Sequence, residues 1–379
     1  MSKMPNKVFA LATRTSVALI LAAMLAACAS DKPKPAELPA NVALLGVRQA
    51  WNVKLAEVGF PLDVNVQGST ISVAGANGTV AALDARTGRE LWRALVGTPL
   101  SAGVGSDGKV TAVVTTGNEL VALESGKEIW RQKLNAQVFT APFVAGGRVF
   151  VLSADRSVSA FDGQGGRRLW TQSRAGEPLV LRQGGVLIAV GDTLVVGLSS
   201  RLVGLNPGNG SVRWEAPVAA PRGTNDVERL VDLVGRVSRV GDVVCARAFQ
   251  AAVGCVNTAR GTVVWSKPAS GSEGVHGDDR LVFGTEADGK VIAWQRTDGT
   301  QAWMTERLRY RGLTAPLAVG RSVAIGDNTG LVHFLSREDG SALTRLTTDG
   351  SPIAAAPVLA GDTVVVVTRN GGIFGFQPE

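Results

Sequence analysis

The chain has 379 residues, 45% of them hydrophobic, and a formal net charge of +7. This is enough apolar material for a sizeable core. Its 39 basic residues are scattered along the sequence and do not form blocks. Scattered charge indicates neither a nucleic-acid-binding footprint nor an electrostatic membrane patch, so no nucleic-acid partner is expected.

The first 27 residues predict a signal peptide. Lys3, Lys7 and Arg14 precede an uncharged run over residues 15–27, which is about half the length that a membrane-spanning helix needs. The run ends at Cys28 in a Leu-Ala-Ala-Cys sequence that resembles a bacterial lipobox. We therefore expect cleavage before Cys28 and lipid attachment to it, the alternative being an ordinary secretory signal followed by an unrelated cysteine.

Removal of the signal lowers the net charge to +4. The next segment, residues 28–45, is expected to contain the lipidated cysteine and a flexible tether. Residues 31–39 contain three prolines and charges of both signs, a composition that favours a short, semi-extended connection. The remainder, residues 46–379, reads as one long folded domain.

A repeat dominates this domain. A strand ending in Asp or Asn is followed by a glycine and, four residues after the glycine, by a tryptophan, as in the segment from Thr79 to Trp92. Successive copies are 38 to 51 residues apart, which is typical of a four-stranded propeller blade. Hairpin signals such as Asn77-Gly78 separate strands of period two. The complete copies end at Trp92, Trp130, Trp170, Trp214, Trp265 and Trp303.

Two further copies are incomplete. Trp51 ends a bare copy near the N-terminus, and Thr344 replaces the tryptophan in the last copy. The end of the chain supplies three strands, over residues 352–360, 363–369 and 372–377, whereas the N-terminal copy supplies a single outer strand over residues 48–55. The repeat therefore predicts an all-β, eight-bladed β-propeller with four antiparallel strands per blade, in which the N-terminal strand joins the C-terminal blade and removes two open edges.

The tryptophans are expected to fill the gaps between blades. A ring of wedge-shaped sheets leaves spaces that widen outward, and an indole on each outer strand suits such a space. The alternative, a row of rings that stack on ligands, fits less well with one tryptophan on each outer strand.

Cys245 and Cys255 lie on either side of a predicted hairpin turn at residues 249–251. The turn places them opposite each other on antiparallel strands, where a disulfide is geometrically feasible in an oxidising compartment. The alternative is a pair of buried free thiols.

Catalytic and metal-binding motifs do not emerge from the sequence. His276 and His333 are the two histidines, and neither has cysteine or carboxylate neighbours at metal-ligand spacing. The adjacent acids Asp278 and Asp279 lie in a predicted turn. We therefore expect no cofactor, no metal and no enzyme activity.

Two consecutive linkers between blades are longer than the others, by about 5 and about 10 residues, which marks them as insertions. The first contains Glu177-Pro-Leu179-Val-Leu181-Arg182, and the second spans residues 225–232 with apolar residues three or four apart. Exposed apolar loops often bind partners, so one composite protein-binding patch is expected. The alternative is that both insertions plug the central channel or pack on each other.

The lipobox, the proline-containing tether, the blades and the two insertions together resemble the BamB family of outer-membrane assembly lipoproteins. The resemblance covers essentially the entire chain. It implies a scaffold on the periplasmic face of the outer membrane that binds the POTRA domains of BamA, acts with other BAM subunits and helps unfolded outer-membrane proteins to assemble.

The family's Leu-x-Leu-Arg loop matches Leu179, Leu181 and Arg182, which the resemblance implies as BamA-binding residues. A second family element, with the pattern Glu-x-x-Arg-Leu-x-Asp-x-Asp, is matched only loosely. Asp226, Glu228, Arg229, Leu230 and Asp232 fit parts of it, and Val234 replaces the last acid. Glu228, Arg229 and Asp232 are the residues taken from it as BamA contacts.

Two other classes of protein share parts of this pattern. Quinoprotein dehydrogenases carry a similar blade motif, but that resemblance implies a longer chain, two adjacent cysteines and a calcium-binding set of side chains. A generic periplasmic interaction propeller shares everything except the two insertions.

Overall fold

The computed structural model describes residues 33–174, 179–220 and 230–379. The chain divides into two compact units, Met1–Pro35 and Ala36–Glu379. Only residues 33–35 of the first unit are described. The architecture below is that of the second unit.

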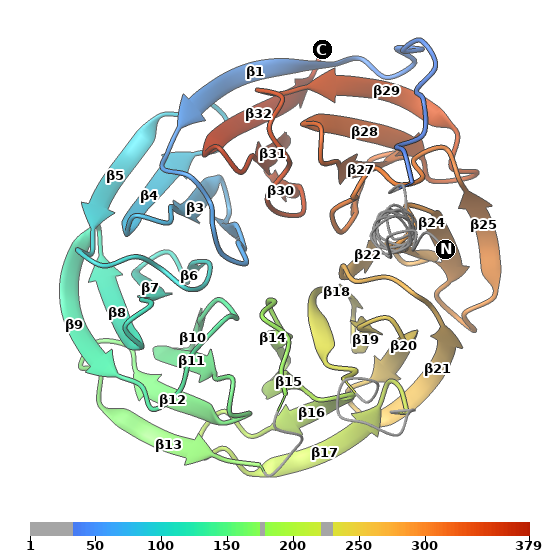
Figure 1. The fold of residues 1–379 in the computed structure, drawn as a ribbon. Coiled ribbons are helices and arrows are strands. Elements are labelled where there is room, and N and C mark those ends of the chain that lie inside the picture. The colour runs from blue at the N-terminus through green and yellow to red at the C-terminus, as the bar shows by residue number, and fades with distance from the viewer. Residues whose placement is uncertain (1–32, 175–178, 221–229) are drawn as a thin grey trace, which may run out of the picture. The chain divides into compact units, whose positions relative to one another are not determined.

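Eight four-stranded antiparallel sheets form a ring in the described part of this unit (Figure 1). This confirms the predicted eight-bladed propeller. Each blade is named here by its strands in order from the axis to the rim.

The first four blades along the chain are built from the following strands. The first has β2 (Asn65–Gln67), β3 (Thr70–Ala74), β4 (Thr79–Asp84) and β5 (Glu90–Leu95). The second has β6 (Gly105–Ser106), β7 (Val110–Val114), β8 (Glu119–Glu124) and β9 (Lys127–Lys133). The third has β10 (Phe143–Ala145), β11 (Arg148–Leu152), β12 (Val158–Asp162) and β13 (Arg168–Gln172). The fourth has β14 (Leu187–Val190), β15 (Thr193–Leu198), β16 (Arg201–Leu205) and β17 (Val212–Pro217).

The last four blades complete the ring. The fifth has β18 (Leu233–Val240), β19 (Val243–Ala248), β20 (Ala252–Asn257) and β21 (Thr262–Pro268). The sixth has β22 (Val275–Gly277), β23 (Leu281–Thr285), β24 (Val291–Gln295) and β25 (Gln301–Thr305). The seventh has β26 (Leu317–Val319), β27 (Ser322–Gly326), β28 (Leu331–Ser336) and β29 (Ala342–Thr347). The eighth has β30 (Val358–Ala360), β31 (Thr363–Val367), β32 (Gly372–Pro378) and β1 (Val47–Lys54).

The eighth blade joins the two ends of the chain. β1 pairs antiparallel with β32, from Val47 opposite Pro378 to Lys54 opposite Gly372 (Figure 1). The predicted closure by the N-terminal strand is therefore confirmed. Because β32 is covered by β1, its backbone groups are paired and do not form an open edge.

Each tryptophan of the repeat lies against the next blade. Trp51 on β1 donates from Nε1 to the Ala85 carbonyl at 2.9 Å, and its ring packs on Gly88 in the turn between β4 and β5. We call this contact between an indole and the glycine of the next blade's outer turn a tryptophan lock. Seven such locks occur, and the tryptophan–glycine pairs are Trp51–Gly88, Trp92–Gly126, Trp130–Gly166, Trp170–Gly210, Trp214–Gly261, Trp265–Gly299 and Trp303–Gly340. The expected role of these residues as wedges between blades is confirmed.

The tryptophan lock requires a glycine in the turn for two separate reasons. At Gly299, for example, φ is +71°, a conformation that costs L-residues energy, and an added Cβ would lie 2.6 Å from the Trp265 ring. The preceding Asp or Asn shapes the same turn. Asn206 Oδ1 accepts from the Gly208 amide at 2.8 Å, so the side chain bonds to the backbone two residues further on and stabilises the turn.

The tether ends earlier than predicted. Residues 33–35 are exposed, but from Ala36 onward the chain is hydrogen-bonded to the seventh blade and its surroundings. Leu38 packs partly buried against the core cluster around Trp303 and Leu313. The expectation of a flexible tether up to residue 45 therefore needs correction, because distant side chains bind the carbonyl groups of this segment.

Within the described residues, no helix combines the length and apolar character needed to cross a membrane.

We predict that Gly299→Ala lowers the free energy of unfolding by about 2–4 kcal/mol, since the methyl group adds a clash with Trp265 to the cost of positive φ. The control is Gly361→Ala. Gly361 has φ +63° but no neighbour within 4 Å of an added Cβ, so only the backbone cost of about 1–2 kcal/mol applies. Denaturant titration measures both losses, and equal losses would contradict the lock.

Candidate functional site

The first insertion presents two of its predicted contact residues to solvent. Residues 179–185, called here the binding loop, lead from the third blade into β14 of the fourth. Leu179 is 41% exposed and Arg182 is exposed, whereas Leu181 is half-buried. Residues 175–178, including Glu177 and Pro178, lie outside the described residues.

A buried ion pair holds the start of the binding loop. Arg156, in the turn between β11 and β12, donates from Nη2 to an Asp232 carboxylate oxygen at 3.1 Å and to the Leu179 carbonyl at 3.0 Å. The other Asp232 oxygen accepts from the Leu181 amide at 3.1 Å. The Arg156 and Asp232 side chains are only 7% and 17% exposed. One carboxylate from the second insertion therefore fixes the main chain of the first.

The end of the loop is fixed by backbone and side-chain bonds. Gly185 forms a β-bridge with Val234, and its amide donates to Thr140 Oγ1 at 2.9 Å. The Gly235 amide donates to the Gly184 carbonyl at 2.9 Å, and Gln183 Nε2 donates to the Ser272 carbonyl at 2.8 Å. The fifth blade and the linkers that precede β10 and β22 thus restrain the end of this short loop.

Arg182 combines exposure with a fixed position. Its guanidinium lies over the Phe139 ring, with 5.8 Å from Cζ to the ring centroid. Cation–π contact at an exposed site contributes about 0.5–1 kcal/mol, enough to favour one orientation. The charge remains available to a partner.

The loop also lines the mouth of a central cavity of about 560 Å³. Arg182, Asp63, Arg236, Glu273 and Arg369 bring charges of both signs to its wall. Desolvation within the cavity raises the pKa of Asp63, partly offset by the Arg236 charge, and likewise raises the pKa of Glu273. Desolvation lowers the pKa of Arg236. The cavity is therefore a polar interior on the axis, with part of the insertion at its rim.

The sequence left two possibilities for the insertions, an exposed protein-binding patch or segments that plug the channel and pack on each other. The structure shows features of both. Residues 183–185 line the channel, and the Leu181 amide bonds to Asp232 of the second insertion. Leu179 and Arg182 face solvent. Of the second insertion, Asp226, Glu228 and Arg229 lie outside the described residues. Leu230 and Asp232 belong to a stretch without helical structure. Cys28 also lies outside the described residues.

Sequence reasoning missed Arg156. Arg156 has φ +62° and lies in the turn between the second and third strands of its blade. Other blades have a glycine at this position, such as Gly78, Gly289 and Gly330. An arginine at a repeat position that favours glycine was the sequence signal that could have marked Arg156 as unusual. Its partner Asp232 is 76 residues away, which no local pattern indicates.

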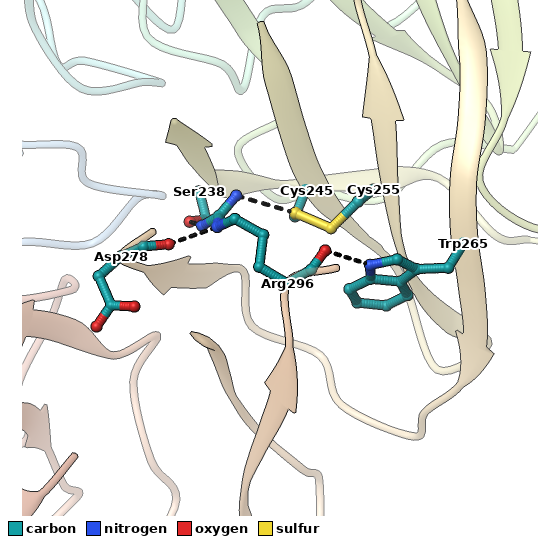
Figure 2. Close-up of a disulfide and its surroundings, with 6 residues drawn as sticks. All are labelled: Ser238, Cys245, Cys255, Trp265, Asp278 and Arg296. Atoms are coloured by element: carbon teal, nitrogen blue, oxygen red, sulfur yellow. Dashed lines mark hydrogen bonds between the residues drawn. A yellow bond between two sulfur atoms is a disulfide. The ribbon is translucent and has the colours of Figure 1, made fainter. Parts of the chain in front are cut away.

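Cys245 and Cys255 are paired in the register of β19 and β20 and are joined by a disulfide (Figure 2). Their Cα atoms are 3.9 Å apart, and both residues are fully buried. Trp265 and Trp294 pack in the same core cluster. The bond thus lies inside the fifth blade, where it faces the sixth.

Arg296, which follows β24, connects these two blades at the disulfide. Its Nη1 donates to Cys245 Sγ at 3.3 Å, and its carbonyl accepts from Trp265 Nε1 at 2.8 Å (Figure 2). The same guanidinium donates to Ser238 Oγ and to the Asp278 carbonyl. Desolvation lowers the pKa of Arg296 to about 10, with Asp279 opposing the shift. Even so, the guanidinium stays charged at neutral pH.

The two histidines have structural partners. His276 Nδ1 accepts from the Ala318 amide at 3.0 Å, and burial, reinforced by Arg236 and Arg296, lowers its pKa to about 3. His333 Nε2 lies 2.9 Å from Asp327 Oδ2. In the parts of the chain that the structure describes, no group of three or more His, Cys, Asp or Glu side chains is arranged to hold a metal.

The fold defines the chain as an eight-bladed β-propeller, and solved structures share this fold. The crystal structure of BamB from Moraxella catarrhalis superposes with a TM-score of 0.80 at 21% identity, covering 87% of this chain and 99% of that one. A quinohemoprotein alcohol dehydrogenase from Pseudomonas putida HK5 superposes with a TM-score of 0.68 at 15% identity, covering 89% and 77%. At these identities the likenesses establish the fold alone.

Sequence similarity establishes the family. The family model described as outer membrane protein assembly factor BamB matches residues 76–305. The chain is 40% identical to the outer membrane protein assembly factor BamB of Burkholderia pseudomallei, over 94% of this chain and 95% of the relative. It is 37% identical to the protein of that name in Bordetella pertussis, over 90% of each. The chain belongs to the BamB family of outer membrane protein assembly factors.

We predict that Arg156→Ala loosens the binding loop. Loss of one partner leaves Asp232 poorly paired, at a cost of about 2–4 kcal/mol in the free energy of unfolding. Hydrogen exchange at the Leu181 and Gly185 amides should also accelerate. Arg93→Ala, which breaks an exposed pair with Glu90, is the control and should cost less than about 1 kcal/mol. Unchanged exchange in Arg156→Ala would contradict the holding role.

We predict two titratable thiols in the denatured mature protein only after reduction. Without reductant, neither Cys245 nor Cys255 should react with a thiol reagent in denaturant, because both sulfur atoms are bonded. Two reactive thiols in the unreduced sample would contradict this pairing.

Proposed function

We propose that the protein is a non-enzymatic scaffold of the outer-membrane β-barrel assembly machinery. It is held on the periplasmic face of the outer membrane by acyl groups on Cys28, binds BamA and assists the assembly of unfolded outer-membrane proteins. The observation that carries the proposal is its similarity, across nearly the whole chain, to proteins named as outer membrane protein assembly factors.

The binding loop supports a docking role. Leu179 and Arg182 are exposed, and the bonds at both ends of the loop limit the conformational freedom that binding would otherwise remove. A half-buried leucine lies between them. An apolar contact and an oriented cation suit a protein partner, and the family resemblance implies the POTRA domains of BamA, together with other BAM subunits.

The second insertion is proposed to contribute in two ways. Asp232 positions the first insertion through its carboxylate, while Glu228 and Arg229 are proposed as direct BamA contacts. Unfolded outer-membrane proteins would be met as extended chains, which can add to strand edges or lie along loops.

An oxidoreductase function is disfavoured by the cysteine arrangement. The resemblance to quinoprotein dehydrogenases implies adjacent cysteines, whereas Cys245 and Cys255 are ten residues apart and bridge two strands inside a blade. The axial wall of Arg182, Arg236 and Arg369 with Asp63 and Glu273 also carries no group of side chains arranged for a metal in the described chain.

We predict that a triple variant, Leu179→Ser, Leu181→Ser and Arg182→Ala, loses most capture of BamA from detergent-solubilised membranes. Its thermal unfolding should remain within a few degrees of wild type, because loop substitutions usually cost under about 0.5 kcal/mol each. The measurement is a pull-down quantified by immunoblot, with thermal unfolding recorded for each variant.

The matched control changes two leucines and an arginine elsewhere. Leu91→Ser, Leu95→Ser and Arg93→Ala lie on β5, where both leucines are exposed, and this variant should still capture BamA. If neither wild type nor control captures it, the proposed partner is wrong. If the folded triple variant captures as much as wild type, the proposed site is wrong.

A further inference from the structure

One joint of the ring lacks a tryptophan lock. Thr344 on β29 occupies the tryptophan position of the seventh blade and is 5% exposed. In the other seven joints, the indole packs on the turn that leads into the next blade's outer strand. No such turn precedes β1, since β1 opens the ring and β32 closes it; instead the Glu379 amide donates to the Gly46 carbonyl at 3.2 Å.

A segment at the start of the folded unit covers this part of the ring. Residues 36–46, called here the strap, run along the seventh blade in Figure 1, where they precede β1. Leu38 packs on the core cluster between the sixth and seventh blades. Leu45 packs on the cluster between the seventh and eighth blades, beside Leu343. Leu45 therefore packs at the joint where the indole is absent, and Leu38 packs at the preceding joint.

Hydrogen bonds fix the strap along its length. At its start, the Ala36 amide donates to the Arg309 carbonyl at 2.9 Å, and Arg311 Nη1 donates to the Ala36 carbonyl at 3.0 Å. Arg311 is itself buried and donates to Asp327 at 2.8 Å. The first residue of the strap is thus bonded to an interior ion pair of the seventh blade.

The rest of the strap is held by two further arginines and by its own backbone. Arg345 Nη2 donates to the Pro39 carbonyl at 3.3 Å, and Arg321 Nη2 donates to the Leu44 carbonyl at 2.6 Å. The Leu44 amide donates to the Leu343 carbonyl at 2.6 Å. Carbonyl groups at three points of the strap therefore accept bonds from arginines of the blade.

Other apolar side chains of the strap point outward. Val42 is 49% exposed and Leu44 is 62% exposed, although the segment that carries them is docked. Tyr310, next to the site where Ala36 binds, is 38% exposed. Exposed aliphatic and tyrosine side chains suit the boundary between lipid headgroups and acyl chains.

The length of the chain limits how far this edge is from the lipid. Eight residue steps separate Cys28 from Ala36, and a chain of that length reaches at most about 28 Å. The acylated cysteine of the proposed function would therefore restrain the seventh blade in particular.

We propose that the strap clamps the membrane anchor to the seventh blade, so that the edge carrying Val42, Leu44 and Tyr310 is the edge of the propeller that contacts the lipid surface. This inference rests on the lipid anchor of the proposed function. The third and fourth blades, which the binding loop connects, lie across the ring from the seventh blade (Figure 1).

The test compares two matched reporter positions in the full acylated chain. Thr347→Cys and Ser173→Cys are exposed, and each lies three residues after the tryptophan position of its blade, the seventh and the opposite third. Each thiol is labelled with a fluorophore. The protein is bound to phosphatidylethanolamine–phosphatidylglycerol vesicles that contain a nitroxide headgroup lipid. We expect several-fold stronger quenching at position 347 than at position 173.

A second pair of variants tests the clamp itself. Arg321→Ala with Arg345→Ala removes two of the strap's bonds and should move the quenching ratio toward one. The control, Arg89→Ala with Arg167→Ala, removes the same charge from exposed turns of other blades and should keep the ratio. Circular dichroism checks that both variants are folded.

The outcomes separate this inference from the proposed function. Equal quenching at both positions in vesicle-bound protein, or a ratio that the strap variant leaves unchanged, overturns the clamp while the anchor stands. A mature protein whose mass shows no acyl groups, and which stays in solution, overturns the anchor and the clamp together.

Discussion

The packing of each tryptophan on the glycine turn of the following blade is the constraint on which the ring depends. A buried indole of this kind removes about 150–250 Å² from solvent. The turn must bring its backbone close to the ring, which only a residue without a side chain at positive φ allows. The two halves of the contact lie in neighbouring copies, so each copy needs both the tryptophan and the glycine. Because every copy needs both residues, the sequence is periodic. Each copy then packs on the next in the same way, and the blades form a closed ring.

The same constraint explains how much could be predicted from the sequence. The lock residues, the hairpin turns and the alternating strands are local signals, and they recur often enough to define each blade. The closing strand was expected over residues 48–55 and is found at Val47–Lys54. Where the repeat was degenerate, at Thr344, the sequence indicated a missing tryptophan but not what fills its place.

The remaining features depend on pairs of residues that are far apart in the chain. Proline content suggested a free tether, yet Arg311 binds the Ala36 carbonyl from 275 residues away. Arg156, in a turn of the third blade, and Asp232, in the second insertion, together hold the binding loop although they are 76 residues apart. These pairs form because the closed ring brings distant parts of the chain together. The periodic pattern of the sequence does not indicate which side chains come into contact in this way. Leu179, Leu181 and Arg182 could be proposed as a site from the sequence, whereas the residues that hold them could not.

The pairing of β1 with β32 has a consequence for the order in which the chain can fold. Seven of the blades are meanders of consecutive strands and need only local contacts, which form quickly. The eighth blade can form only after synthesis is complete, because its outer strand, β1, is synthesised first and the strand that pairs with it, β32, is synthesised last. Until then β1 has no partner, and the growing ring has open edges that favour association with other chains. A polypeptide that stops short of β32 keeps those edges, so completion of the ring distinguishes a full-length chain from a truncated one.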